Sequence, residues 1–192
     1  MKVSKETSTK HRDELLRAAS RLFRERGFDK VGIAEIAAAA NLTHGAFYAH
    51  FASREAMLAE AADRAGAESN AFAASVIAAA PPEQSLQALM HAYLSEEHLA
   101  AIETGCPVSA LGSEMPRQAP EVRRAATRRI KEMIDMVARQ SPDWGQPAAH
   151  ERALVTVAAM VGTLMMARAV DDPALSEPRR RAVLNHFTPA RR

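Results

Sequence analysis

The sequence is poor in the features that mark secreted or membrane proteins. It has one cysteine in 192 residues, so no disulfide can form within the chain and a reducing compartment is expected. Residues 1–10 are polar, so we expect no signal peptide. Apolar runs are interrupted by charge or glycine before they reach the length of a membrane span, so we expect no membrane association. These shortages predict a soluble, cytoplasmic protein.

An excess of one charge sign is also missing. The chain has 25 Lys+Arg against 23 Asp+Glu, so any surface that attracts nucleic acid must be local. Residues 1–30 are biased, because nine basic and five acidic residues leave a net charge of +4 there. We expect residues 1–9 to be disordered. Their Lys2 and Lys5 either reach a neighbouring DNA groove or stay in solvent.

Strand patterns and catalytic motifs are absent as well. No segment alternates apolar and polar residues over the length of a strand. There is no glycine-rich phosphate loop and no nucleophile elbow, and the spacing of Glu97, His98 and Cys106 matches no zinc pattern. We therefore expect no enzyme activity, no cofactor and no metal. The alternatives are an all-helical enzyme and a helical adaptor that binds another protein.

What the sequence does contain is helical periodicity. A helix is predicted over residues 10–26, because five apolar residues of this segment share one face. Gly27 stands where a helix ends in a left-handed conformation, and Phe28 is expected to pack back on Phe23. The residues predicted on the buried face are Leu15, Leu16, Ala19, Leu22 and Phe23.

Two short helices are expected next. The first spans residues 33–40, with Gly32 as N-cap and Asn41 as a left-handed stop. The second follows Thr43 as N-cap, and the turn between them makes a helix-turn-helix.

The segment NLTHGAFYAHF, residues 41–51, places its aromatic rings on two faces. Phe47 and Phe51 are four residues apart and are expected to join Leu42 in the core. His44 and Tyr48 then face outward, among small residues that let the helix approach a groove.

Residues 10–58, which include LFRERGFD, IAEIA and FYAHFASREAML, resemble the N-terminal domain of TetR-type (AcrR-type) transcriptional regulators. The resemblance implies an all-α fold: a three-helix DNA-binding head in residues 1–52, with the helix-turn-helix at 33–52, and a helical body in residues 53–192 that binds ligand and dimerises. It also implies a double-stranded DNA operator as partner. By position, the implied DNA contacts are Ile33, Ala34, Thr43, His44, Gly45, Ala46, Tyr48, His50 and Arg54.

Each of these contacts has a chemical rationale. Thr43 offers a hydroxyl to a phosphate and a methyl to thymine, and the imidazole of His44 can bond to guanine N7 or O6. Tyr48 and His50 are expected on phosphates, as is Arg54 at the start of the fourth helix. The sequence departs from the family at Gly32, usually Ser or Thr, and at Ala34, often longer and polar. Shape readout is therefore expected to carry more of the specificity.

About nine helices are expected in total. Those of the body are predicted at residues 53–79, 82–95, from 107, 120–140, 148–170 and 173–187, with an irregular link before Cys106. The first of these is rich in alanine and is expected to slide at small packing cost. The helix at 148–170 is apolar around much of its circumference, which favours a homodimer through the last two helices, as the resemblance also implies.

The methionines give the hint about a ligand. Met is favoured where several shapes must fit, so we expect a mostly apolar or aromatic effector, although gap-filling in an alanine-rich core would give the same pattern. The single thiol, Cys106, precedes Pro107 at a helix start and is either a reactive redox site or a packed residue. The residues expected to line the ligand site are Met57, Met90, Tyr93, Val108, Leu111, Met133, Val137, Met160 and Leu164.

Overall fold

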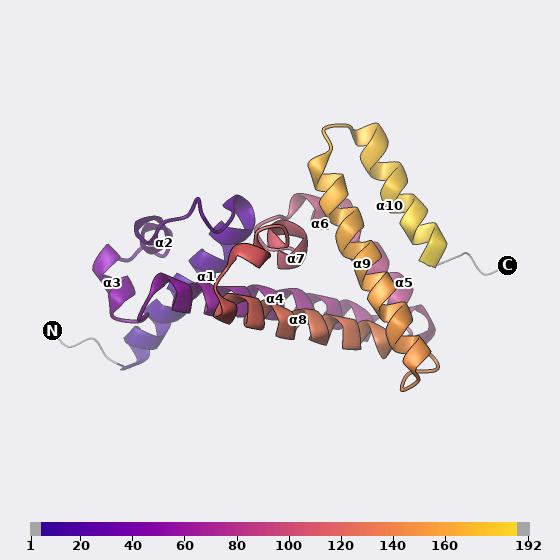
Figure 1. The fold of residues 1–192 in the computed structure, drawn as a ribbon, viewed down its shortest axis with the longest axis horizontal. Helices are drawn as coiled ribbons and strands as arrows, with labels where there is room; N and C mark the ends of the chain where they lie inside the picture. The colour runs from indigo at the N-terminus through magenta and orange to yellow at the C-terminus, as the bar shows by residue number, and fades with distance from the viewer. Residues whose placement is uncertain (1–4, 188–192) are drawn as a thin grey trace.

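The computed structural model describes residues 5–187, apart from the side chain of Pro173, and every regular element within them is helical (Figure 1). There are ten α-helices in this part of the chain, one more than expected, because Glu96–Ala100 forms a short helix in place of an irregular link. The elements are α1 (Lys5–Arg26), α2 (Ile33–Ala39), α3 (His44–Tyr48), α4 (Arg54–Ala79), η1 (Pro82–Gln84), α5 (Ser85–Tyr93), α6 (Glu96–Ala100), α7 (Pro107–Leu111), η2 (Met115–Arg117), α8 (Pro120–Ala138), α9 (Pro147–Ala169) and α10 (Pro173–Phe187).

Helix α1 begins earlier than predicted. Its first residue is Lys5, so the expected disorder of residues 1–9 is wrong for residues 5–9, and Lys2 lies outside the described residues. The predicted end of the helix is confirmed. Gly27 has a φ of 88°, and the rings of Phe23 and Phe28 lie 5.5 Å apart.

The predicted helix-turn-helix is also confirmed. Helix α2 follows Gly32 in an extended N-cap conformation, and Asn41 has a φ of 56°. Thr43 occupies the N-cap position of α3, although its side chain makes no capping hydrogen bond. The hydroxyl of Ser53 does cap α4, where it accepts the N–H of Ala56 at 3.1 Å.

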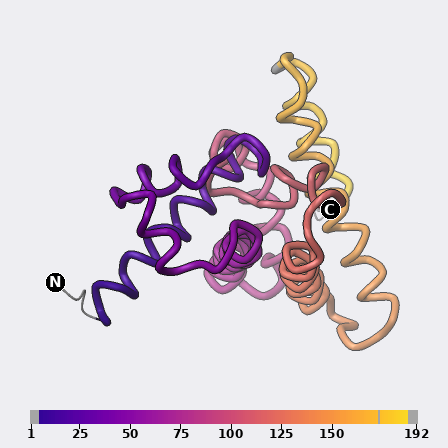
Figure 2. The backbone as a smooth tube through the Cα atoms, turned by 60° about the vertical axis from the view of Figure 1, so that its left-hand side comes forward, coloured from indigo at the N-terminus to yellow at the C-terminus, as the bar shows by residue number. Residues whose placement is uncertain are grey.

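The body is built around α4 and α8, which lie side by side and run away from the head (Figures 1 and 2). Helices α9 and α10 pack on each other at the opposite end of the molecule from α3. Helix α7 lies between the head and this end, in contact with α1, α4 and α9. The long helices therefore connect the head to the distal body.

Two clusters of buried apolar side chains form the core. The proximal cluster joins Phe28 and Phe47 of the head to Met57 of α4 and Leu111 of α7. The distal cluster contains Met90, Tyr93, Cys106, Met133 and Met160, among others. The alanine-rich middle of α4 passes from one cluster to the other.

Helix α9 contains the long apolar stretch that the sequence predicts at residues 148–170. Within residues 5–187 it is the one helix that is long and apolar enough to cross a membrane by length and composition. One of its faces packs in the distal core, through Val157, Met160 and Leu164. The other face is apolar but open, since the side chains of Val155 and Met166 are 60% and 51% exposed.

Candidate functional site: an outward helix face and a body cavity

The first candidate site is the outward face of α3. The ring of Tyr48 is 62% exposed and that of His44 is also exposed, whereas Phe47 and Phe51 are 0% and 4% exposed. The two buried rings lie 5.4 Å apart and fix the helix on the proximal core. The ring of Tyr48 makes edge contacts with His44 at 5.5 Å and Phe47 at 5.1 Å. The predicted split of the aromatic residues is therefore confirmed.

The other predicted DNA contacts differ in how far they are exposed to solvent. Ala34, Thr43 and Gly45 are exposed, and a Cβ on Gly45 would meet open space except for the Thr43 hydroxyl at 4.0 Å. A helix face with small residues can approach a nucleic-acid groove closely. The contacts that are only partly exposed are Ile33, Ala46, His50 and Arg54.

His50 and Arg54 are both engaged with the protein. Burial, together with His11 and Arg12 of α1, lowers the pKa of His50 below its usual value, so its imidazole stays neutral near pH 7. Arg54 donates from Nη2 to the carbonyls of Phe28 and, at 3.3 Å, Val31. Its guanidinium thus holds the loop between α1 and α2.

The basic bias of residues 1–30 is largely neutralised by ion pairs. Arg12 pairs with Glu60, Arg21 with Glu103, and Arg24 with Glu68, so α1 is fastened to the body along its length. Arg24 is almost fully buried, and it donates five hydrogen bonds, one of them to its charge partner Glu68. Much of the positive charge expected in residues 1–30 is therefore paired with carboxylates of the same chain.

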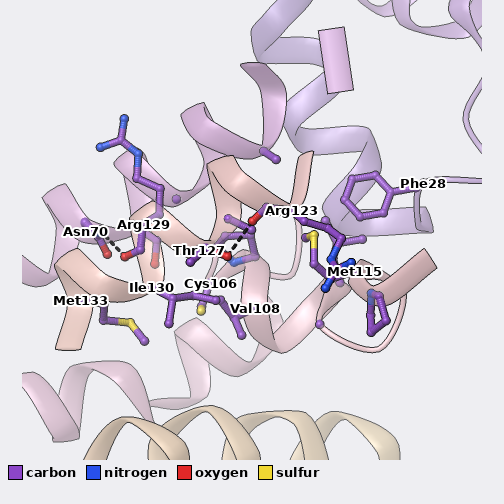
Figure 3. Close-up of a pocket in the computed structure, with 18 residues that line it drawn as sticks. Phe28, Asn70, Cys106, Val108, Met115, Arg123, Thr127, Arg129, Ile130 and Met133 are labelled. Carbon is purple, nitrogen blue, oxygen red and sulfur yellow. Dashed lines mark hydrogen bonds between the residues drawn. The ribbon is translucent and has the colours of Figure 1, made fainter. Parts of the chain in front are cut away.

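The second candidate site is a cavity of about 300 Å³ between α4, α7, α8 and η2 (Figure 3). Phe28 and Met115 lie at one end and Asn70 and Met133 at the other, so the cavity is elongated. Most of its surface is apolar, with the hydroxyls of Ser69 and Thr127 as polar groups on the sides. Such a lining suits a small organic molecule.

The charged groups of the cavity are of one sign. Arg123 and Arg129 are among the lining residues, and no Asp or Glu is. Arg129 forms two hydrogen bonds of 2.7 Å to the carboxylate of Asp63, and this pairing lowers the pKa of Asp63. Arg129 can cross α4 there because Gly66 has no Cβ, which would lie 2.5 Å from Arg129 Cγ. Arg123 is exposed beside Met115 (Figure 3).

The cavity contains three of the nine residues expected to bind ligand, namely Val108, Leu111 and Met133. The remaining six pack in the two cores and do not line it, because their helical spacing reflects burial rather than an open space. These are Met57 in the proximal core and Met90, Tyr93, Val137, Met160 and Leu164 in the distal core. The lining residues that sequence reasoning missed are chiefly polar or outside the helices, such as Phe28, Asn70, Met115 and Thr127.

Cys106 is the N-cap of α7, as predicted, and lines the cavity while being only 1% exposed. Its backbone N–H donates to His98 Nε2 at 3.1 Å, while His98 Nδ1 bonds to the carbonyl of Tyr93 at 2.7 Å. His98 is therefore a neutral ring held at both nitrogens, and burial lowers its pKa. Among residues 5–187 no group of three or more His, Cys, Asp or Glu is arranged to hold a metal ion.

Comparisons with known proteins agree with this architecture. Residues 15–61 match the model of bacterial regulatory proteins of the tetR family, and residues 82–175 match that of the C-terminal domain of LmrA/YxaF-like transcriptional regulators. These matches span more than half of the chain, which belongs to the TetR family of transcriptional regulators. No curated protein matches the chain.

Solved structures show the same fold. The reduced form of Escherichia coli NemR is 19% identical with a TM-score of 0.78, and the match covers 93% of this chain and 95% of NemR. A TetR-family regulator from Agrobacterium tumefaciens is 19% identical with a TM-score of 0.78, covering 93% of this chain and 98% of that one. A regulator from Chloroflexus aurantiacus is 21% identical with a TM-score of 0.79, covering 96% and 97%.

Proposed function

We propose that this regulator is a cytoplasmic repressor that binds a palindromic operator as a homodimer and is released by a small effector in the body cavity. The observation that carries the proposal is the outward face of α3, where His44 and Tyr48 are exposed above the buried Phe47 and Phe51. A helix of five residues reads few base pairs, so two copies are needed, on half-sites about 34–36 Å apart. The division into a head, residues 1–52, and a body, residues 53–192, belongs to the same proposal.

The partner surface in the dimer is the open face of α9 together with α10. Val155 and Met166 are exposed on α9 and Leu175 on α10, and exposed apolar groups of this size are normally covered. The length and composition of α9 thus reflect burial on both sides, in the core and in the dimer.

The effector we propose has a mostly apolar or aromatic body and a neutral or anionic polar group. The cavity offers apolar walls, two hydroxyls and two arginines, but no carboxylate that would hold a cation. Arg123 is the side chain placed to meet an anion, because Arg129 is already paired with Asp63.

Selection of bound sequences from a random DNA pool tests the operator proposal. We expect a palindrome, and enrichment of a single non-repeated site would contradict the dimer. In the selected operator, His44→Ala should relax base preference at a defined position. Tyr48→Phe should weaken binding to all sequences alike and leave the salt dependence unchanged, since the phenol is proposed to donate a hydrogen bond to a phosphate and carries no charge. Identical behaviour of the two variants would refute these roles.

We propose different roles for the other predicted DNA contacts, according to how exposed each side chain is. Thr43, Gly45 and Ala34 are exposed on or beside the α3 face and are proposed to touch the DNA directly. Arg54 has its Nη2 on two carbonyls, so we propose that it acts chiefly by holding the α1–α2 loop, with any phosphate contact made through its other nitrogens. The partly exposed Ile33, Ala46 and His50 are proposed to lie at the edge of the interface.

A second candidate signal is alkylation or oxidation of Cys106. One observation favours it: the thiol lines the cavity, so an electrophile that enters the cavity would meet it. The NemR structure, described as a reduced form, belongs to a protein of the same fold. N-ethylmaleimide should then modify folded protein and lower operator affinity, and Cys106→Ser should resist the reagent. Reaction of the thiol only after denaturation would mean that Cys106, which is 1% exposed, is simply packed.

A further inference from the structure

We propose that residues 106–116, here called the wall segment, transmit occupancy of the cavity to the DNA-binding head, and that Glu114 is the side chain through which they act. This inference rests on the proposed function, because it requires that the cavity and the operator influence each other. It adds the physical connection between them, which lies outside helix α4.

The wall segment forms one side of the cavity. It contributes residues from the start of α7 to the 3-10 turn η2, so a molecule in the cavity presses on this segment along most of its length (Figure 3). The wall-segment residues that line the cavity are Cys106, Pro107, Val108, Leu111, Gly112, Met115 and Pro116.

Near both of its ends, the wall segment is hydrogen-bonded to the end of α1 and the residues that follow it. Near the first end, directly before the segment, the buried guanidinium of Arg24 donates to the carbonyls of Thr104 and Gly105, each at 3.1 Å. At the second end, the carboxylate of Glu114 accepts the backbone N–H of Phe28 at 2.8 Å. The segment is thus attached to the first helix of the DNA-binding head and to the loop that follows this helix.

The contact of Glu114 depends on the shape of the α1 terminus. Gly27 adopts a φ of +88°, and a Cβ at this position would lie 2.5 Å from Glu114 Oε1. The carboxylate therefore occupies space that only glycine leaves open. The carbonyl of the same Phe28 accepts a hydrogen bond from Arg54 at the start of α4. Phe28 is held by the wall segment on one side and by α4 on the other.

Phe28 connects this contact to the recognition helix. Its ring lines the cavity, and it belongs to the same buried cluster as Phe47 of α3. When a ligand displaces Met115 and the η2 turn, Glu114 moves off the Phe28 N–H and the end of α1 is freed to shift with the head. The ligand thereby favours the state in which the two heads of the dimer no longer match the operator.

A cavity-filling substitution tests this without a known ligand. Ala126→Trp fills the cavity from α8, and its effect is measured as the ratio of operator dissociation constants with and without the substitution. The operator is the one obtained by selection. The ratio is measured in the unmodified chain, in Glu114→Ala, in Glu114→Gln, which keeps an acceptor oxygen, and in Glu60→Gln. Glu60 is the matched control, because it pairs with Arg12 between α1 and α4, away from the wall segment.

We expect a ratio of about 10-fold or more in the unmodified chain, in Glu114→Gln and in Glu60→Gln, and less than about 3-fold in Glu114→Ala. A purely structural Glu114 would lower stability but leave this ratio unchanged, so an undiminished ratio in Glu114→Ala overturns the inference. Helical content by circular dichroism is checked for each variant, and Ser69→Phe, from α4, replaces any Ala126→Trp protein that does not fold. If neither filling variant changes operator binding in the unmodified chain, the proposed link between cavity and DNA fails, and the role of Glu114 with it.

Discussion

Replacing Gly27 with alanine should destabilise the fold much more than replacing Gly145, although the two glycines have similar backbones. Their φ values are +88° and +97°. A left-handed conformation costs an alanine about 1–2 kcal/mol, and about 0.4–1 kcal/mol is regained because the unfolded chain loses freedom. The backbone therefore contributes roughly 1 kcal/mol of destabilisation at either position.

The surroundings of the two glycines differ. A Cβ at Gly145 meets nothing within 4 Å, whereas a Cβ at Gly27 would lie 2.5 Å from Glu114 Oε1. Moving the carboxylate leaves the N–H of the fully buried Phe28 without its acceptor, which costs about 1–3 kcal/mol. The expected loss is then about 3 kcal/mol for Gly27→Ala and about 1 kcal/mol for Gly145→Ala.

The assay is urea unfolding followed by circular dichroism, at one protein concentration because a dimer is expected. The double variant Gly27→Ala with Glu114→Ala isolates the effect of the carboxylate. Once the carboxylate of Glu114 is gone, alanine at position 27 should lower the free energy of unfolding only by its backbone contribution. A Gly27→Ala variant within about 0.5 kcal/mol of Gly145→Ala would refute the reasoning, because the carboxylate would then have kept its bond from a new position.

Three further outcomes follow from burial and charge. Phe47→Ala should cost about 3–5 kcal/mol in urea unfolding and Tyr48→Ala less than about 0.5 kcal/mol, and similar losses would contradict the outward face of α3. Because burial holds the pKa of His98 below the 6.5 of a free histidine, the unfolded chain takes up the proton first. Stability should therefore be full above pH 6.5 and fall as the pH is lowered below it, and His98→Gln should lose less over that range. Val155→Glu should produce monomers in sedimentation velocity while Trp144→Glu, at a similarly exposed loop residue, should not, and unchanged dimers would exclude α9 as the interface.

The head could be predicted from the sequence because its signals are local. The left-handed stops at Gly27 and Asn41 and the split between Phe47 and Tyr48 each depend on a few consecutive residues. The early start of α1 at Lys5 was missed because polar residues have no buried face to mark them, although they extend an existing helix easily.

The cavity could not be predicted in the same way. Helical spacing identifies the side of a helix that is buried, but not whether another side chain fills the space opposite. Met90 and Met160 therefore fill the distal core. The open space is lined instead by polar residues such as Asn70 of α4 and Thr127 of α8. The contact of Glu114 with Phe28 joins residues 86 positions apart, so no local pattern reveals it.

The cavity lies where the two apolar clusters meet, and this position determines how the proposed effector would act on the head. Leu111 and Phe28 belong to the proximal cluster, whereas Cys106 and Met133 belong to the distal one. Three connections cross this boundary: the continuous helices α4 and α8, each of which contributes to both clusters, and the wall segment with its hydrogen bonds to α1. Kinking either helix would break several backbone hydrogen bonds at once.

Releasing Glu114 from Phe28 breaks one hydrogen bond to a charged group, worth about 1.5–3 kcal/mol. That amount is comparable to the coupling of about 1–3 kcal/mol that typically links two ligands of one protein. In the proposed regulation, the wall segment is therefore the connection that a small molecule of ordinary affinity can switch, with α4 and α8 moving as intact helices.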